Sequence, residues 1–109
     1  MIKYLIKEQL PAGFEPIKNP VFLHLWFGLG RPVNHFGTGK NSGKIKDSSP
    51  AFPAVMPDID NYEKFILDCM NGIVFVDDRQ VVSIRSDKRY TLNPRTEVNI
   101  TELNLKNSE

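Results

Sequence analysis

The chain has 109 residues, 40% of them hydrophobic, and its 14 basic and 13 acidic residues give a formal net charge of +1. This length suits one domain with a modest core. The balanced charge does not by itself indicate a nucleic-acid binder, because the distribution of charge matters more than its sum. The single cysteine, Cys69, excludes an intramolecular disulfide, and two histidines are too few for a convincing zinc site.

The apolar stretches of the chain are short. The longest runs from Val21 to Leu29 and contains His24, so it is far shorter than a membrane-spanning helix. The N-terminus has no basic region followed by an apolar run and a cleavage site, which a secretory signal would need. We therefore expect a soluble protein of a reducing compartment, with no membrane partner.

The first predicted element is a strand at residues 21–27 (VFLHLWF). Residues 1–20 are ambiguous, because an apolar start is followed by prolines and a glycine that break any pattern. The run VFLHLWF is short and rich in β-branched and aromatic residues, which predicts a strand buried on both faces or nearly so. We interpret His24 and Trp26 within it as core residues.

Residues 28–57 form a predicted loop in which glycines and prolines recur and no hydrophobic period survives. An irregular segment of this length in a small domain usually means function or disorder. Basic charge concentrates here against a single acid, Asp47; the basic residues are Arg31, His35, Lys40, Lys44 and Lys46. The loop is a candidate for contacts with DNA phosphates, and a solvated linker is the alternative.

The stretch GTGKNSGK at residues 37–44 is similar to a phosphate-binding loop but does not match one. The Walker pattern requires G-x-x-x-x-G-K followed by serine or threonine, at the start of a helix. Here Gly37 and Gly43 are six positions apart instead of five, and Ile45 follows Lys44. We therefore reject a nucleotide cofactor bound by this motif.

The best helical pattern lies at residues 61–71. Apolar residues recur there at the spacing of one helix face: Tyr62, Phe65, Ile66, Cys69, Met70 and Ile73. Asp60 stands where an N-cap belongs, and Glu63 three residues later completes a pattern similar to a capping box. Gly72 predicts the end of the helix, in the left-handed conformation that glycine favours.

The last third of the chain predicts β structure. Residues 73–76 read as a short apolar strand that ends at Asp77–Asp78, and residues 80–90 alternate in part between apolar and polar positions. A turn and a final strand near residues 98–100 follow, and the polar tail at residues 106–109 is expected to fray. We predict one domain, residues 1–109, of the α/β (α+β) class, a small mixed sheet with one main helix.

Aspartates gather on either side of the predicted helix. Asp58 and Asp60 precede it and would point to one side if that segment is extended, and Asp78 ends the strand that follows. Asp78 would approach them only if its strand lies beside the segment that leads to Asp58, which spacing alone does not show. Three carboxylates meeting there, with Lys64 one turn into the helix, would suit Mg²⁺ or Mn²⁺.

Such a site would have the components needed to hydrolyse a phosphodiester. The metal would polarise a phosphoryl oxygen and lower the pKa of the attacking water. Lys64 would add positive charge where the transition state builds negative charge.

The same residues also have structural interpretations. Helix capping alone would explain Asp60, and from the spacing alone it is the favoured explanation. Lys64 and Asp68 are spaced as an ordinary surface pair on a helix, and Asp77–Asp78 fits a simple turn.

The residues from Pro57 to Val82, PDIDNYEKFILDCMNGIVFVDDRQVV, resemble the signature of the RusA family of Holliday junction resolvases. That signature has D-x-D-N-x-x-K, then a helix, then a short strand that closes in D-D-x-Q-V-V. The resemblance covers about a quarter of the chain. The upstream GRPVNHFGTGKNSGK is also similar to a long loop seen in many phage and bacterial relatives.

The resemblance implies a helix packed on a small mixed sheet, and a metal-dependent endonuclease that cuts four-way DNA junctions as a homodimer. It implies metal-binding carboxylates at Asp58, Asp60 and Asp78, with Mg²⁺ as cofactor and Mn²⁺ as a substitute. It further implies a catalytic Lys64, a lesser role for Asp77, and a cytoplasmic, nucleoid-associated protein of bacterial or phage origin.

Two parts of the chain depart from the family pattern. The segment before the first strand (residues 1–20) is short, and thus divergent or truncated. The run FPAVMP precedes Asp58 where the best-known member has basic residues. We therefore expect the DNA contacts elsewhere, at Arg31, Lys40, Lys44, Lys46, Arg79, Arg85, Lys88 and Arg89.

The sequence thus predicts a Holliday junction resolvase that hydrolyses a symmetric pair of phosphodiesters in DNA recombination and repair. A non-catalytic DNA-binding module of the same fold is the first alternative. An interaction protein whose aspartates serve only as caps and turns is the second.

Overall fold

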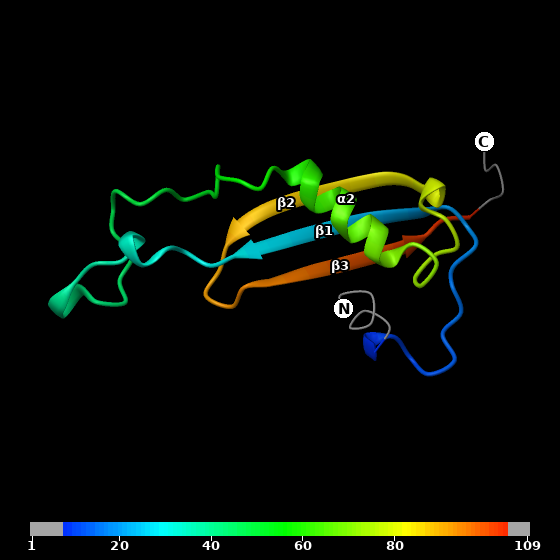
Figure 1. Cartoon of the computed structure of the whole chain (residues 1–109), viewed down its shortest axis with the longest axis horizontal. Coiled ribbons are helices and arrows are strands. Elements are labelled where there is room, and N and C mark those ends of the chain that lie inside the picture. Colours follow the sequence, from blue (N-terminus) through cyan, green and yellow to red (C-terminus); the bar gives the residue numbers. More distant parts are fainter. Residues whose placement is uncertain (1–7, 105–109) are drawn as a thin grey trace.

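A computed structural model describes residues 8–104 of the chain. Three strands form one sheet in the order β2–β1–β3, and helix α2 lies across one face of that sheet (Figure 1). The elements are β1 (Val21–Leu29), the 3-10 turns η1 (Val33–His35) and η2 (Gly39–Asn41), α2 (Ile59–Met70), the 3-10 turn η3 (Asp78–Gln80), β2 (Val81–Tyr90) and β3 (Arg95–Glu102). The predicted fold, a main helix on a small mixed sheet, is confirmed.

The predicted elements differ from the observed ones mainly at their ends. The helix begins two residues earlier than predicted, at Ile59, and the last strand is longer than residues 98–100. The expected frayed tail at residues 106–109 lies outside the described residues, as do residues 1–7 of the divergent N-terminal segment. Within residues 8–104, no helix is long and apolar enough to cross a membrane.

β1 is the central strand, parallel to β2 and antiparallel to β3. A parallel pair needs a long crossover connection, which here contains α2. The chain then passes from β2 to β3 across the end of β1, where the Thr91 amide donates to the Leu29 carbonyl at 2.8 Å. A Cβ on Gly28 would lie 2.5 Å from the Trp26 ring and 2.7 Å from the Thr91 side chain, so glycine is required at this crossing.

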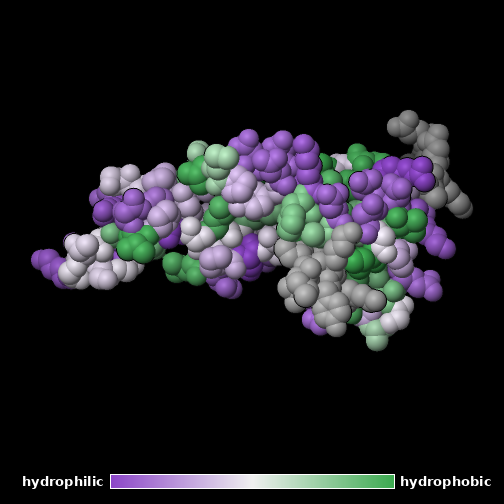
Figure 2. All heavy atoms as spheres, viewed as in Figure 1, coloured by the Kyte–Doolittle hydropathy of each residue, from purple (hydrophilic) through white to green (hydrophobic). Residues whose placement is uncertain are grey.

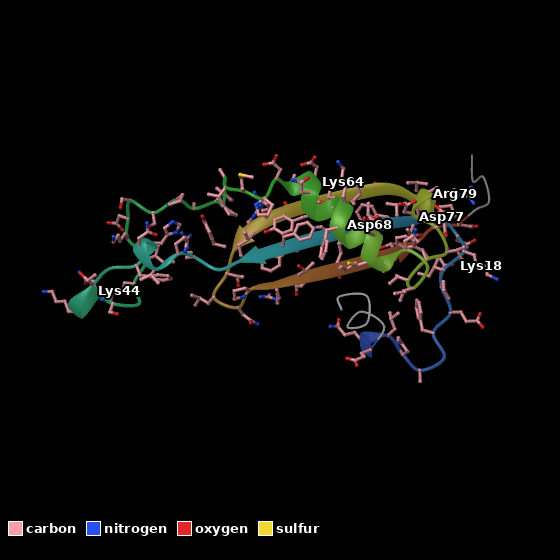
Figure 3. The ribbon with its side chains drawn as sticks, in the orientation of Figure 1. Lys18, Lys44, Lys64, Asp68, Asp77 and Arg79 are labelled. Carbon is pink, nitrogen blue, oxygen red and sulfur yellow. The ribbon has the colours of Figure 1, made fainter. Side chains whose placement is uncertain are left out.

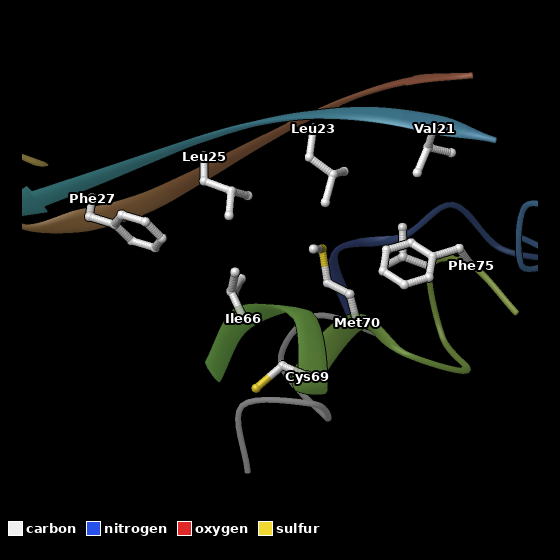
Figure 4. Packing of buried hydrophobic residues seen from close by; sticks show 9 residues of the cluster. Val21, Leu23, Leu25, Phe27, Ile66, Cys69, Met70 and Phe75 are labelled. Atoms are coloured by element: carbon white, nitrogen blue, oxygen red, sulfur yellow. The ribbon is translucent and has the colours of Figure 1, made fainter. Parts of the chain in front are cut away.

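The core lies between β1 and α2 (Figure 4). Alternate residues of β1 face the helix and are buried: Val21, Leu23, Leu25 and Phe27. They meet Ile66, Cys69 and Met70 on α2, which belong to the apolar stripe read from the sequence. Each large side chain buried in this way stabilises the fold by about 1.5–3 kcal/mol.

The strand was predicted to be buried on both faces or nearly so; one face of β1 is buried, and the other is only partly buried. His24 and Trp26 alternate with the core residues and lie on the side away from α2. The sequence does not show the alternation of apolar and polar residues expected for a half-buried strand, because both faces carry large aromatic or aliphatic side chains.

The segment after α2 is not the predicted strand at residues 73–76. Gly72 has the expected left-handed conformation, with a φ of 80°, and it turns the chain back at the end of the helix. Val74 and Phe75 then enter the core, and Phe75 lies near Val21 (Figure 4). Two backbone hydrogen bonds with Ile17 hold the segment there. The Ile17 amide donates to the Val74 carbonyl at 2.9 Å, and the Val76 amide donates to the Ile17 carbonyl at 3.1 Å.

Residues 30–57 form a long projection, which we call the arm (Figure 1). The molecule measures 58 × 35 × 20 Å, and its radius of gyration of 17.8 Å exceeds the roughly 13 Å of a compact chain of this length. The two legs of the arm are tied together, since the Arg31 guanidinium donates to the Pro50 carbonyl at 2.7 Å and the Ser49 hydroxyl to the His35 carbonyl at 2.9 Å. The predicted irregular loop is therefore a defined structural feature.

Candidate active site and nucleic-acid interface

Two of the predicted metal ligands lie at the start of α2. Asp58 is the N-cap, and its carbonyl accepts hydrogen bonds from the amides of Asn61 at 3.1 Å and Tyr62 at 3.3 Å. Its carboxylate makes no capping hydrogen bond. Asp60 lies within the first helical turn, so the prediction that Asp60 is the N-cap was wrong. Both carboxylates are exposed, and neither is needed to satisfy the helix end.

Glu63 has a different role from the one predicted for it in a capping box. Its carboxylate accepts a hydrogen bond of 2.6 Å from the Ser86 hydroxyl on β2. This contact fixes the first turns of α2 against the second half of β2. The sequence pattern did not reveal it, because Glu63 and Ser86 meet only after the crossover is formed.

The segment that leads into α2 is anchored to the same part of β2. The Lys88 ammonium donates to the carbonyls of Val55 at 2.6 Å and Pro57 at 3.1 Å. Lys88 was predicted to contact DNA, but its donors instead hold the approach to the helix. The position of Asp58 and Asp60 is thus set by the end of β2 and not by the loop alone.

Lys64 lies one turn beyond Asp60 on the exposed side of α2 (Figure 3). Residues four apart on a helix are neighbours, yet among residues 8–104 Lys64 forms no ion pair within 4 Å. The predicted surface pair with Asp68 is therefore not formed. Within the described part of the chain, Lys64 thus has no carboxylate partner and lies one helical turn from Asp60.

Asp78 lies at the opposite end of β2 from Asp58. It begins η3, directly before Val81, whereas Asp58 lies near Lys88. Residues 81 to 88 of an extended strand span roughly 20 Å at about 3.3 Å per residue. The predicted convergence of the three carboxylates within one chain is therefore wrong. Among residues 8–104, no group of three or more histidine, cysteine, aspartate or glutamate side chains is placed to hold a metal ion.

The physical reason is the segment after the helix. The sequence predicted a short strand at residues 73–76 and left open whether it returns along α2 toward Asp58. Val74 and Phe75 are instead buried at the far end of the core, so the chain remains near the last turn of the helix until β2 begins.

Asp77 has a structural role. Its carboxylate accepts from the Arg79 amide at 3.0 Å, and its own amide donates to the Gln80 side chain at 2.8 Å. The hydrogen bond from the Arg79 amide is the largest effect on the pKa of Asp77 and lowers it below its ordinary value; burial opposes this, and the Asp78 side chain and the charge of Arg79 lower the pKa further. Gln80 also donates to the Ile17 and Asn19 carbonyls. The turn interpretation of Asp77 is thus confirmed, while the Asp78 carboxylate is exposed.

The predicted DNA-contacting residues fall into separate groups. Lys40, Lys44 and Lys46 are exposed on the outer part of the arm (Figure 3 labels Lys44). The Arg31 guanidinium stacks 4.3 Å from the centre of the Tyr90 ring, so it supports the base of the arm. Arg79 is exposed beside Asp77, far from the arm.

A cluster on the face of the sheet opposite α2 was not singled out from the sequence. The Asp87 carboxylate accepts from His24 Nε2 at 3.0 Å, Arg85 Nε at 3.1 Å and Arg89 Nη2 at 3.2 Å. The alternation of side chains along β2 already indicates that the two arginines lie on one face. Their proximity to His24 could not be predicted, because it depends on the register between β1 and β2. Arg85 and Arg89 are therefore held by one carboxylate.

Comparison of the sequence with known protein families identifies the family of this chain. The family model for endodeoxyribonuclease RusA matches residues 1–101. The chain belongs to the RusA family. This RusA-family chain is also 43% identical over 51 residues to the uncharacterized protein YqaN of Bacillus subtilis (strain 168). That match covers 47% of the chain and 36% of YqaN, so the chain matches about a third of that relative's length. No solved structure matches.

The cluster around Asp87 predicts a pH dependence of stability. The hydrogen bond from His24 is the largest effect on the pKa of Asp87 and lowers it below 3.8; burial, the second largest, opposes this, and contacts with Arg85 and Arg89 lower the pKa further. Stability from this depressed pKa is fully present above pH 3.8 and is lost as the pH falls through the folded-state pKa. Asp87→Asn should therefore lower the free energy of unfolding at pH 7, and the deficit should shrink near pH 3.

Urea unfolding at both pH values measures this effect. Glu97→Gln is the matched control, because Glu97 pairs with Arg95 at 3.5 Å in an exposed position, where ion pairs contribute little. A deficit of the same size for Asp87→Asn at pH 7 and pH 3 would contradict the assignment.

Proposed function

We propose that this RusA-family chain is a metal-dependent endonuclease that resolves four-way DNA junctions in recombination and repair. It acts as a homodimer, with Mg²⁺ as cofactor and Mn²⁺ as a substitute, and hydrolyses one phosphodiester in each of two symmetric strands. The family match over residues 1–101 carries the nuclease assignment. The free carboxylates of Asp58 and Asp60 support its location at the start of α2.

The donors at the start of α2 fit a hard divalent cation. Mg²⁺ keeps several waters and commonly takes only one or two protein carboxylates, with substrate phosphate completing its shell. Asp58 and Asp60 are exposed and do not cap the helix, so these two residues would hold the ion. When bound, it would polarise a phosphoryl oxygen and lower the pKa of the attacking water.

Lys64 is the residue of this chain best placed to act on the transition state. Its ammonium lies one turn from Asp60 and is free of carboxylate partners among the described residues. Positive charge near the transferring phosphoryl group stabilises the negative charge that develops there. Lys64 is thus proposed as the catalytic cation.

The arm is proposed to bind the DNA backbone. Its exposed lysines, Lys40, Lys44 and Lys46, project from the end of the sheet that carries Asp58 (Figures 1 and 3). Lysine contacts to phosphate fix the orientation of DNA without reading its sequence. The arm would therefore hold one limb of a junction while the active site reaches the strand near its crossover.

Asp78 is proposed to act across the dimer. It lies roughly 20 Å along β2 from the level of Asp58 in the same chain, but the outer edge of β2 pairs with no other strand among residues 8–104. A two-fold axis near the middle of β2 would place the start of β2 in one subunit beside its end in the other. Asp78 of one copy would then lie near Asp58 and Asp60 of its partner, and a dimer would contain two such sites.

A non-catalytic DNA-binding module is the alternative function. The observation that favours it is the separation of Asp78 from the other two aspartates within one chain. Such a module predicts junction binding that weakens with salt and no cleavage.

Asp58→Asn should abolish metal-dependent nicking of a labelled four-way junction, by roughly 100-fold or more, because a ligand charge is lost. The wild-type protein should give paired nicks with Mg²⁺ and none with chelator. Its melting temperature should rise with millimolar Mg²⁺, by linkage of binding to folding, and that of Asp58→Asn should rise less.

Asp77→Asn is the control, because Asp77 serves as a cap; it should lose stability but retain metal-dependent nicking. Junction binding without nicks in the wild type would support the alternative function. A wild-type protein that neither binds nor cuts the junction would contradict both.

Mixed dimers test whether Asp78 acts across the subunits. Asp58→Asn and Asp78→Asn should each be inactive alone. If the sites are shared, a dimer with one subunit of each kind has one intact site and one doubly defective site. An equal mixture, in which about half of the dimers are mixed, should therefore regain single nicks.

Within-chain sites predict the opposite, because every site in the mixed dimer would then carry one defect. A short thiol crosslinker gives an independent readout that needs no activity. Asp58→Cys and Asp78→Cys chains should crosslink to each other, while Asp58→Cys and Thr101→Cys, on the far edge strand β3, should not. No rescue together with no crosslink would contradict the shared site.

A further inference from the structure

An open cleft lies between the second leg of the arm and β2, and it ends at the start of α2. Its volume is about 540 Å³, and it is lined on the arm side by residues 52–56 and on the other side by Asp58, Ile59 and residues of β2. Pockets of roughly 300–1,000 Å³ hold small organic groups. The cleft is therefore large enough for part of a nucleotide.

The arm side of the cleft is apolar and uncovered. Phe52 is 61% exposed and Met56 is 83% exposed, and Val55 between them is also exposed. In Figure 2, hydrophobic surface on this part of the arm adjoins the hydrophilic surface over α2. This leg is the FPAVMP run, which stands where basic residues were expected, so the predicted phosphate contacts do not explain it.

The polar side chains that β2 contributes to the cleft are already engaged, whereas the Asp58 carboxylate at its end makes no capping hydrogen bond. The Lys88 ammonium is bound to two backbone carbonyls and the Ser86 hydroxyl to Glu63. The Arg89 guanidinium, held by the Asp87 carboxylate and the Lys88 carbonyl, lies over one face of the Phe52 ring, 5.2 Å from its centre. The cleft thus offers an exposed aromatic ring with a fixed cation over one face, and few free groups for hydrogen-bonded recognition.

We propose that this cleft binds one unstacked base of a DNA strand, which stacks on the face of Phe52 that Arg89 does not cover. Aromatic rings and guanidinium planes stack on every base because each base has a π-face. At the crossover of an open four-way junction the flanking base pairs lack a stacking neighbour on one side, whereas every base pair inside a continuous duplex is stacked on both sides. The attraction between the guanidinium and the ring face that it covers helps to hold Phe52 in place.

This inference rests on the proposed function, because the cleft ends at Asp58. A base stacked on Phe52 would place the next phosphate of its strand toward the carboxylates of α2. Stacking would therefore select strands at a branch point and position them for cleavage. It would favour structure and not a particular base.

The test is the affinity of the whole protein for a synthetic four-way junction and for a linear duplex of the same length, both in chelator. Phe52→Ala should weaken junction binding about tenfold, within the range for one stacking aromatic, and leave duplex binding within twofold. Phe52→Trp should restore junction binding. Phe65→Ala is the matched control, because Phe65 is 51% exposed on α2 and lies outside the cleft.

Each other outcome overturns the inference. Equal losses for junction and duplex, or for Phe52→Ala and Phe65→Ala, would show that stacking is not involved. Conversion of a dimer to a monomer by Phe52→Ala in sedimentation would show that a second copy occupies the cleft. If the protein nicks junctions with metal but Phe52→Ala has no effect on binding, the proposed function stands and this site is lost. If junction binding depends on Phe52 but no nicking occurs, the site stands and the proposed function is lost.

Discussion

The packing of α2 along β1 determines where every acidic residue of the RusA signature lies. The apolar stripe of the helix covers one face of the central strand, and both ends of the helix are fixed. Lys88 binds the carbonyls that precede Asp58, and Phe75 is buried beyond the last turn. Because these anchors are near opposite ends of β2, Asp58 and Asp60 are held a strand's length from Asp77 and Asp78.

Because of this separation, the two ends of the sheet carry different functional groups. The start of α2 brings together two free carboxylates, a free ammonium and an apolar cleft, and the arm extends from the same end of the sheet (Figure 1). The other end carries Asp78 beside a turn that Asp77 stabilises. A two-fold dimer would join the two ends, and it would also match the symmetry of a four-way junction, which presents two equivalent strands.

Local features of the fold were predictable from the sequence, and features that depend on chain crossover were not. The helix and its Gly72 end follow from hydrophobic period and turn chemistry. The run IVFV at residues 73–76 was misread as a strand, because a short apolar run does not reveal whether it pairs or simply enters a core. The cap was placed two residues late, at Asp60 instead of Asp58, which is a common error at helix ends. The contacts of Ser86, Asp87 and Lys88 required the parallel register of β1 and β2.

The most direct measurement is anomalous diffraction from crystals soaked in Mn²⁺, because it locates the ion without relying on activity. We expect a peak beside the carboxylates of Asp58 and Asp60, with Asp78 from a second subunit directed toward the same peak. No peak at the start of α2, or occupancy only near Asp77 and Asp78, would contradict the assignment of the active site.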